Sequence, residues 1–229
     1  MKKFIISILV LLVIGVGFYI GYRHSVNKKA ELLNTFFTAI KNRDETQIQS
    51  LLRKGMNVNA KDKNGTTPLM RIAFDGNTST AKYLLDNGAD VNLSNNFEMT
   101  ALMNAASRPY SDSHPKDNNL EIARILVDHG ADINFKSKTG WTALMGAANA
   151  NQTDVALYLL DHGAEVNTQY IPNGQTVLIM AVQRRNKVLV EALINKGADV
   201  NIRDNSGWSV LRQAQDHPEI TELLKQAGA

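Results

Sequence analysis

Hydrophobic residues along this 229-residue chain recur in neighbouring pairs, and a glycine follows each pair within four residues. Apolar positions three and four residues apart around each pair indicate an amphipathic helix. A glycine readily adopts the left-handed conformation that ends a helix. The pairs are Leu51 and Leu52, Leu84 and Leu85, Leu126 and Val127, Leu159 and Leu160, Leu193 and Ile194, and Leu223 and Leu224. The pattern therefore predicts a recurring helix that ends at the glycine.

A second recurring helix is predicted ahead of these helices, and a hydroxyl side chain marks its start. Such a side chain accepts hydrogen bonds from the free backbone amides of a first helical turn, and Pro68 suits the first helical position. The hydroxyl residues are Thr67, Thr100, Thr142, Thr176 and Ser209. Small residues in the same stretches let this helix approach its neighbours closely: Ala73, Ala105, Ala106, Ala147, Ala148, Ala181 and Ala214.

Two phrases recur in register, so the helix pairs belong to a sequence repeat. The phrase GADVN, or a close variant, has its glycine at positions 55, 88, 130, 163 and 197, at intervals of 33, 42, 33 and 34 residues. The second phrase reads GTTPL, MTAL, GWTAL, GQTVL and GWSVL in successive periods. Helix pairs with a polar turn and this period resemble the ankyrin repeat.

The resemblance covers residues 31–229 and implies an all-α ankyrin-repeat solenoid of helix-turn-helix units with short β-turns or hairpins. Within a repeat domain at 30–229, it places a cap at 31–60, repeats at 61–93, 94–135, 136–168 and 169–202, and a C-terminal cap at 203–229. The family's TPLH tetrapeptide reads TPLM, TALM, TALM, TVLI and SVLR here. We therefore expect the family's threonine–histidine hydrogen bond to be absent.

An uncharged apolar run from Phe4 to Tyr22 lies within the N-terminal segment 1–29. A helix of its 19 residues is about 28 Å long, close to the hydrocarbon thickness of a bilayer. Residues 4–22 are therefore predicted to form one transmembrane helix. The sequence Gly15-Val16-Gly17 is a poor cleavage site because it lacks alanine, which favours an uncleaved signal anchor over a signal peptide that is removed.

Basic residues stand on both sides of this run, so the positive-inside rule is nearly balanced. Lys2 and Lys3 directly before the run are typical of an export signal. We expect a single-pass protein of the inner (cytoplasmic) membrane with a periplasmic repeat domain. The alternative is a protein secreted to the periplasm after signal cleavage.

The charge of the chain is misleading as a guide to its partners. The formal charge is +3, from 25 basic and 22 acidic residues, but five basic residues and no acidic residue precede position 30. The remaining chain is slightly acidic, whereas a nucleic-acid partner calls for a basic face. Since cysteine is absent, disulfides, thiolate metal sites and thiol catalysis are excluded. We expect no nucleic-acid partner.

The resemblance implies a binding surface of variable residues on the concave side of the stack, along the turn tips and first helices. Tryptophan, tyrosine and arginine are enriched at binding hot spots. This favours a patch around Trp141, Tyr170 and Trp208, and the alternative is that the tryptophans only cover adjacent turns. Two rows of such residues recur, one directly after the turn glycine or its substitute and one at the turn tips. The candidate partner contacts in these rows are Trp141, Trp208, Tyr170, Met99, Lys61, Lys136 and Arg203.

The third unit is nine residues longer than 33, and the surplus falls at 107–119. Its prolines and polar residues predict an exposed loop between two helices. Tyr110 and His114 in this loop are further candidates for contact with a partner. The alternative is a tolerated surface insertion without function.

The sequence offers little for catalysis. His129 and His162 stand at equivalent places in successive repeats, but adjacent helices are too far apart for the two rings to share an ion easily. We expect them instead in the last turn of their helices, where the helix dipole favours positive charge. Asp112, Ser113 and His114 are consecutive and cannot form a catalytic relay.

We therefore expect a non-catalytic module, without a cofactor, metal or small-molecule substrate, that binds a partner protein at the membrane. The resemblance to membrane-tethered ankyrin proteins implies a role as a scaffold, an inhibitor or an immunity factor against a toxic enzyme. The alternative is a component of a membrane-associated enzyme or transport system with an unrecognised site.

Overall fold

The computed structural model describes residues 28–108 and 116–229, and the chain divides into two compact units, with the boundary in the sequence between Ala60 and Lys61. In the described part of the first unit, one helix covers residues 28–41 and is followed by α2 (Glu45–Arg53). The side chain of Asp44 caps α2 by accepting a hydrogen bond from the amide of Gln47. Phe36, Ile48 and other apolar residues of this helix pair are fully buried.

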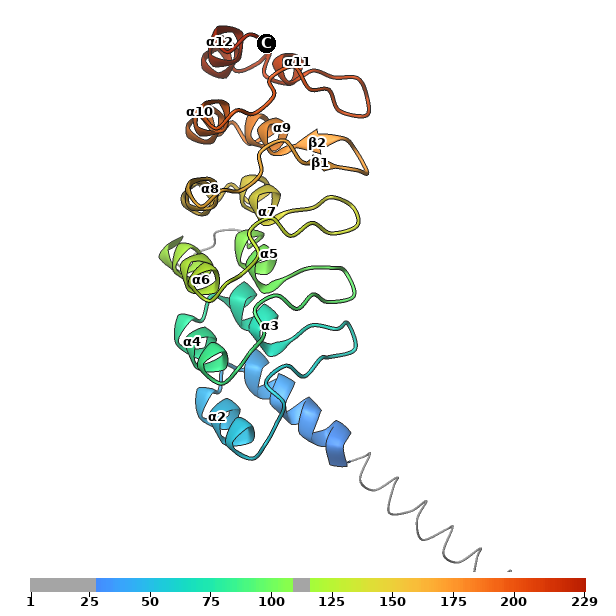
Figure 1. Cartoon of the computed structure of the whole chain (residues 1–229), viewed down its shortest axis with the longest axis vertical. Helices are drawn as coiled ribbons and strands as arrows, with labels where there is room; N and C mark the ends of the chain where they lie inside the picture. The colour runs from blue at the N-terminus through green and yellow to red at the C-terminus, as the bar shows by residue number, and fades with distance from the viewer. Residues whose placement is uncertain (1–27, 109–115) are drawn as a thin grey trace, which may run out of the picture. The chain divides into compact units, whose positions relative to one another are not determined.

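The second unit is a stack of helix pairs with a loop ahead of each pair (Figure 1). The first helices of the pairs are α3 (Pro68–Asp75), α5 (Ala101–Ala106), α7 (Ala143–Asn149), α9 (Val177–Gln183) and α11 (Val210–Gln213). The second helices are α4 (Thr78–Asp86), α6 (Lys116–Asp128), α8 (Thr153–Asp161), α10 (Lys187–Asn195) and α12 (Pro218–Gln226). The repeat predicted from the sequence is therefore present as an almost entirely helical stack.

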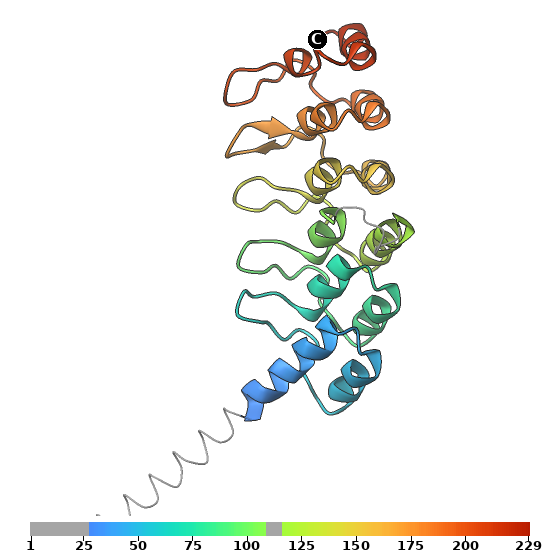
Figure 2. The same cartoon turned by 180° about the vertical axis from the view of Figure 1, so that it is seen from behind.

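First helices contact first helices, and second helices contact second helices, along the second unit. The resulting two columns are visible from both sides, with the loops projecting beyond the column of first helices (Figures 1 and 2). The predicted small residues Ala105, Ala147, Ala181 and Ala214 are completely buried in the first column. A continuous apolar interior runs through the stack because each helix pair buries residues against the next one.

The predicted hydroxyl caps are confirmed at the start of all five first helices in the second unit. Each side chain accepts a hydrogen bond from the amide three residues further on, as from Met145 to Thr142 at 3.2 Å. At the first of these caps, another hydrogen bond takes the place of the threonine–histidine bond that the TPLH tetrapeptide would make. The amide of Thr67 donates to the sulfur of Met70 at 3.4 Å, so a thioether accepts a hydrogen bond inside this cap.

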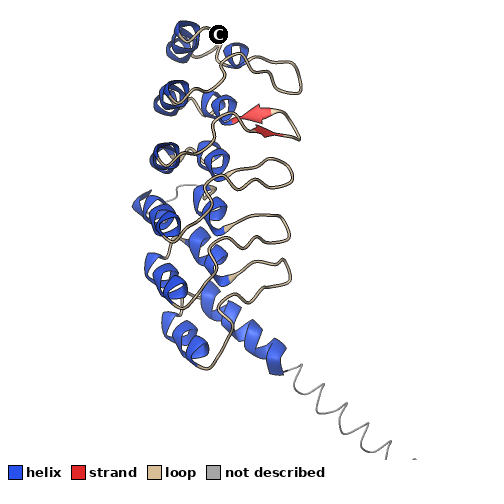
Figure 3. Cartoon of the chain, in the orientation of Figure 1, coloured by secondary structure: helices blue, strands red, loops and turns tan. Residues whose placement is uncertain are grey.

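The loops are β-hairpin-like, and one of them forms a short antiparallel sheet of β1 (Gln169–Tyr170) and β2 (Gln175–Thr176) (Figure 3). A polar side chain at the start of the turn ties it together. Asp204, for example, accepts hydrogen bonds from the amides of Ser206 and Trp208. These local bonds fix the turns without requiring long strands.

The GADVN asparagines form a ladder between successive repeats. Asn134 donates to the carbonyl of Gly163 at 3.1 Å and accepts from the amide of Glu165 at 2.8 Å. Asn92 and Asn167 make the same pair of bonds to the following repeats. The aspartates of the phrase serve as turn residues, as predicted, because the side chain of Asp132 accepts from the amide of Asn134.

The prediction that 107–119 is an exposed loop throughout is wrong at both ends. Helix α6 already begins at Lys116, and Arg108 and Asn119 are buried, with exposed fractions of 3% and 1%. The guanidinium of Arg108 donates to the side-chain oxygen of Asn119 at 2.7 Å. The main-chain carbonyl of Arg108 accepts a hydrogen bond from the side-chain amide of Gln152. The ends of the insertion are therefore fastened to each other and to the next repeat, which polar composition alone did not reveal.

The predicted membrane segment, residues 4–22, lies outside the described residues. Across 28–108 and 116–229, no helix combines the length and the apolar character needed to cross a membrane.

Candidate functional site

An open groove of about 350 Å³ lies among three successive hairpins of the second unit. We refer to it as the hairpin groove. It is lined by Phe97, Met99, Ser107, Ser137, Thr139, Trp141 and Tyr170. Three of the predicted contact residues, Met99, Trp141 and Tyr170, therefore line one groove although they belong to three different repeats.

An aromatic pair forms part of the groove wall. The rings of Trp141 and Tyr170 meet edge to face, with centroids 5.1 Å apart and an interplanar angle of 76°. Tyr170 is held in β1, and the amide of Trp141 donates to the hydroxyl of Ser137 at 3.0 Å. Both rings are half-buried, so each has one face supported by the protein and some surface left for a ligand.

The lining carries no charged side chain. Beside the aromatic and thioether groups the lining contains Ser107, Ser137 and Thr139. Ser137 and Thr139 bond to each other at 2.9 Å, whereas the buried hydroxyl oxygen of Ser107 has no hydrogen-bond partner among the described residues. Such a surface suits apolar side chains together with a few uncharged polar groups.

An ion pair borders the groove. Glu98 and Lys138, which come from consecutive hairpins, approach to 2.9 Å through the carboxylate and the ammonium group. Hydrogen bonds from Lys138 lower the pKa of the Glu98 carboxyl, and the same contact raises the pKa of Lys138. Both groups are charged near neutral pH and balance each other, so the rim adds no net charge to the groove.

The remaining predicted residues lie away from the hairpin groove. The guanidinium of Arg212 stacks over the ring of Trp208 at 4.1 Å, and Trp208 is absent from the lining, which splits the predicted patch. Arg203 is bonded to the carbonyl of Gly207 in the same hairpin, and Lys61 to the carbonyl of Ser94. Lys136 pairs with Glu165 at 2.5 Å in a separate depression. Tyr110 and His114 lie outside the described residues.

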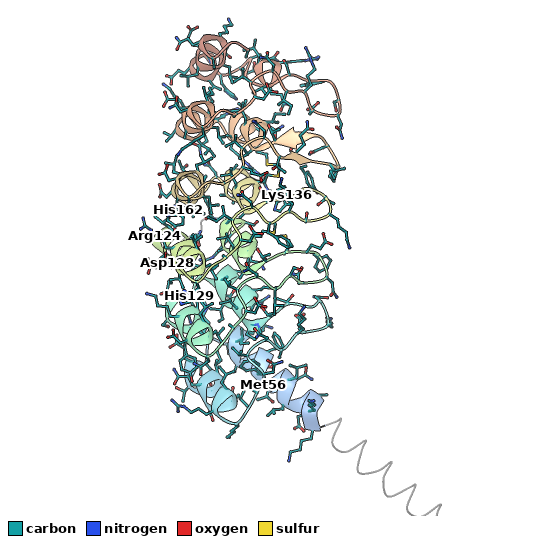
Figure 4. The ribbon with its side chains drawn as sticks, viewed as in Figure 1. Met56, Arg124, Asp128, His129, Lys136 and His162 are labelled. Atoms are coloured by element: carbon teal, nitrogen blue, oxygen red, sulfur yellow. The ribbon has the colours of Figure 1, made fainter. Side chains whose placement is uncertain are left out.

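His129 directly follows the last residue of α6, and His162 directly follows the last residue of α8 (Figure 4). Nδ1 of His129 is 2.7 Å from the carbonyl of Ile125, and Nδ1 of His162 is 2.8 Å from that of Tyr158. The sequence predicted them in the last turn of their helices; they stand one residue beyond that turn, and their rings contact its carbonyl groups. No group of three potential metal ligands occurs in the described part of the chain.

A stacked cluster also occupies the second helices. Arg124 lies over the ring of Tyr158 at 5.3 Å, and that ring is 4.0 Å from the ring of His162. Burial raises the pKa of Tyr158. These contacts join α6 to α8 and account for the cluster by packing alone.

Sequence reasoning missed two prominent residues on the hairpins. Phe97 and Ile171 are 68% and 65% exposed, the highest values among large hydrophobic residues of the described chain. Phe97 lines the hairpin groove, and Ile171 follows directly after Tyr170. A large apolar residue inside an otherwise polar turn was the available signal, because exposed apolar patches mark interaction sites.

Comparisons with known proteins agree with the stacked architecture. The chain matches a family model described as ankyrin repeats (3 copies) over residues 36–115, 115–170 and 168–229. It is similar to an ankyrin repeat protein of Fowlpox virus (strain NVSL), with 37% identity over 70 residues, or 31% of this chain and 10% of the viral protein. It is also similar to the ankyrin repeat, SAM and basic leucine zipper domain-containing protein 1 of Carollia perspicillata. That match has 30% identity over 99 residues, or 40% of this chain and 21% of that protein. The chain thus spans a minor part of the length of both relatives.

Proposed function

Because this chain belongs to the ankyrin repeat family, whose repeats are in general non-enzymatic protein-binding scaffolds, we propose that it binds a partner protein in the hairpin groove. The observation that carries the proposal is the convergence of Met99, Trp141 and Tyr170 from three repeats on one uncharged groove. Aromatic residues that are packed against their neighbours and partly shielded from water are common binding hot spots at the centre of protein interfaces.

The partner contributes an uncharged segment with at least one large apolar side chain. The groove carries no charged lining residue, and the nearby Glu98–Lys138 pair is internally neutral. A charged anchor would therefore lose its hydration without finding an opposite charge in the groove. Met99 adapts to different apolar shapes, and the hydroxyl of the exposed Thr139 can bond to the backbone of an extended segment.

The tether is the second part of the proposal. Residues 4–22 hold the protein in the inner membrane, and the repeats face the periplasm, where they act as a scaffold, inhibitor or immunity factor. The support is the uncharged apolar run of bilayer length behind two lysines. The test is a fusion, after Ala229, of a reporter enzyme that works only in the cytoplasm. Activity of this reporter would contradict the proposed orientation.

The test uses the tagged full chain in its own cells, with chemical crosslinking and identification of captured proteins by mass spectrometry. Trp141→Ala should reduce capture of the specific partner at least about tenfold, since truncating a hot-spot residue costs 2 kcal/mol or more. Trp208→Ala is the matched control, because Trp208 holds the equivalent position in a hairpin outside the groove.

A second groove variant guards against loss of folding. Phe97 is 68% exposed, so Phe97→Ala should leave the melting temperature nearly unchanged. It should weaken capture of the same protein. Undiminished capture by both Trp141→Ala and Phe97→Ala would refute binding in the hairpin groove.

A further inference from the structure

Neighbouring hairpins of the second unit are joined at their tips by main-chain hydrogen bonds at three of four junctions. The amide of Asn96 donates to the carbonyl of Asn64, that of Ile171 to Thr139, and that of Asn205 to Asn173, each at 2.9 Å. These bonds do not depend on the identity of a side chain. They set the spacing of the hairpins on either side of them.

The remaining junction, between the hairpins of Glu98 and Lys138, is built differently. There the amide of Lys138 donates to the side-chain carboxylate of Glu98, and the Lys138 ammonium lies 2.9 Å from the other carboxylate oxygen. One acidic side chain therefore takes both the main-chain and the side-chain donor of Lys138. An ionised carboxylate is a stronger hydrogen-bond acceptor than a neutral carbonyl.

The backbone at Glu98 shows that this residue replaces a glycine. Its φ is 58°, and the equivalent places in the other four hairpins are Gly65, Gly140, Gly174 and Gly207, with φ between 70° and 78°. A side chain at positive φ strains the backbone, which glycine avoids. The local conformation therefore favours glycine, and the benefit of Glu98 must come from its contact with the next hairpin.

The contact lies directly beside the hairpin groove. The neighbours of Glu98 in sequence, Phe97 and Met99, both line the groove, and so do the neighbours of Lys138, Ser137 and Thr139. We infer that Glu98 is a positioning residue that fixes the distance between these two groove walls and so determines which partner segments fit. The inference rests on the proposed function of the groove as the partner-binding site.

An ordinary surface ion pair would not have this role, because such pairs contribute little. The side chain of Glu98 is only 24% exposed, although that of Lys138 is 90% exposed. The bond to the Lys138 amide also fixes the main chain of the second hairpin, which an ammonium on a flexible side chain cannot do. The Lys136–Glu165 pair, whose contact is between side chains, serves as the comparison.

Glu98→Gly separates positioning from stability. We expect the full chain, purified in a mild detergent, to keep or raise its melting temperature, because glycine relieves the strain at φ 58°. Hydrogen exchange at the amide of Lys138 should nevertheless become at least about tenfold faster, as its acceptor is lost. Glu98→Gln, which keeps an acceptor oxygen, should restore much of the protection. Glu165→Gln should leave the exchange at Lys138 unchanged.

Partner capture is then compared in the same variants. Faster exchange at Lys138 together with weaker capture by Glu98→Gly, and recovery of both by Glu98→Gln, would support the inference. Unchanged exchange in Glu98→Gly would overturn it, and so would faster exchange with undiminished capture. Trp141→Ala tests the groove itself without touching this contact, so failure of the proposed function shows in that variant independently.

Discussion

Replacing Gly140 with alanine tests how much the stack depends on close approach between hairpins. Gly140 has φ 78°, and a Cβ placed there would collide with the main-chain carbonyl oxygen of Gln169 in the following hairpin. The neighbour cannot give way by turning a side chain, because the obstructing atom belongs to the backbone. The substitution must therefore strain one hairpin and displace the next.

The cost can be worked out from two parts. Alanine in the left-handed region costs about 1–2 kcal/mol. A displaced neighbour also weakens the hydrogen bond from Ile171 to Thr139, which is worth about 0.5–1.5 kcal/mol. Gly140→Ala should therefore destabilise the protein by roughly 1.5–3.5 kcal/mol. For a domain of this size, each kcal/mol lowers the melting temperature by about 2–4 °C.

Gly207 is a matched control within the same chain. It has the same φ of 78° at the equivalent place in the last hairpin, but a Cβ there would meet no atom within 4 Å. Gly207→Ala should cost only the backbone part, about 1–2 kcal/mol. The assay is thermal and urea-induced unfolding of the full chain in detergent, followed by circular dichroism at 222 nm. Equal destabilisation by the two variants would refute the claim that hairpin contact is the source of the difference.

Two further predictions concern the asparagine ladder and acid sensitivity. Asn134→Ala removes two bonds to the next repeat and should cost about 1–3 kcal/mol, whereas Asn201→Ala removes one bond, to Gly228, and should cost about half as much. A larger fall in melting temperature for Asn201→Ala than for Asn134→Ala would contradict the stabilising role of the asparagine ladder. The Lys187 ammonium lowers the pKa of the Glu219 carboxyl in the folded protein. The ion pair therefore contributes its full stabilisation above the unfolded pKa of about 4.3. This contribution is lost as the pH falls through the lower pKa of the folded state. The melting temperature should fall slightly less between pH 6 and pH 3 in Glu219→Gln than in the unchanged chain, and 1 M salt should remove the difference; a larger fall in the variant would be inconsistent with this pair.

The local features of the fold were readable from the sequence because their causes are local. A hydroxyl before an apolar stretch caps a helix wherever it occurs, as Thr142 and Thr176 do. A glycine such as Gly163 takes positive φ at a helix end for the same reason. The recurrence of these signals then predicted the stack, since helix pairs of one period bury their apolar faces against their neighbours.

The candidate site was predictable only in part. The row that contains Met99 and Trp141 followed from the repeat, and so did the turn position of Tyr170. Trp208 holds the position equivalent to that of Trp141 in its own hairpin, but it lies against Arg212 rather than in the groove. Phe97 looked like one apolar residue in a polar turn, and its place in the groove depends on the hairpin that lies next to it.

What the sequence determined by itself was the repeating helix pair, its caps and its period, since short-range hydrogen bonds and the apolar pattern specify these features. The tertiary structure alone decided the contacts between residues about 40 positions apart, such as Glu98 with Lys138 and Arg108 with Gln152. Polar side chains in a turn can bond locally, to water or to a neighbouring repeat. Only the stacking of complete repeats brings a particular donor to a particular acceptor, and this selection forms both the rim of the hairpin groove and the base of the insertion.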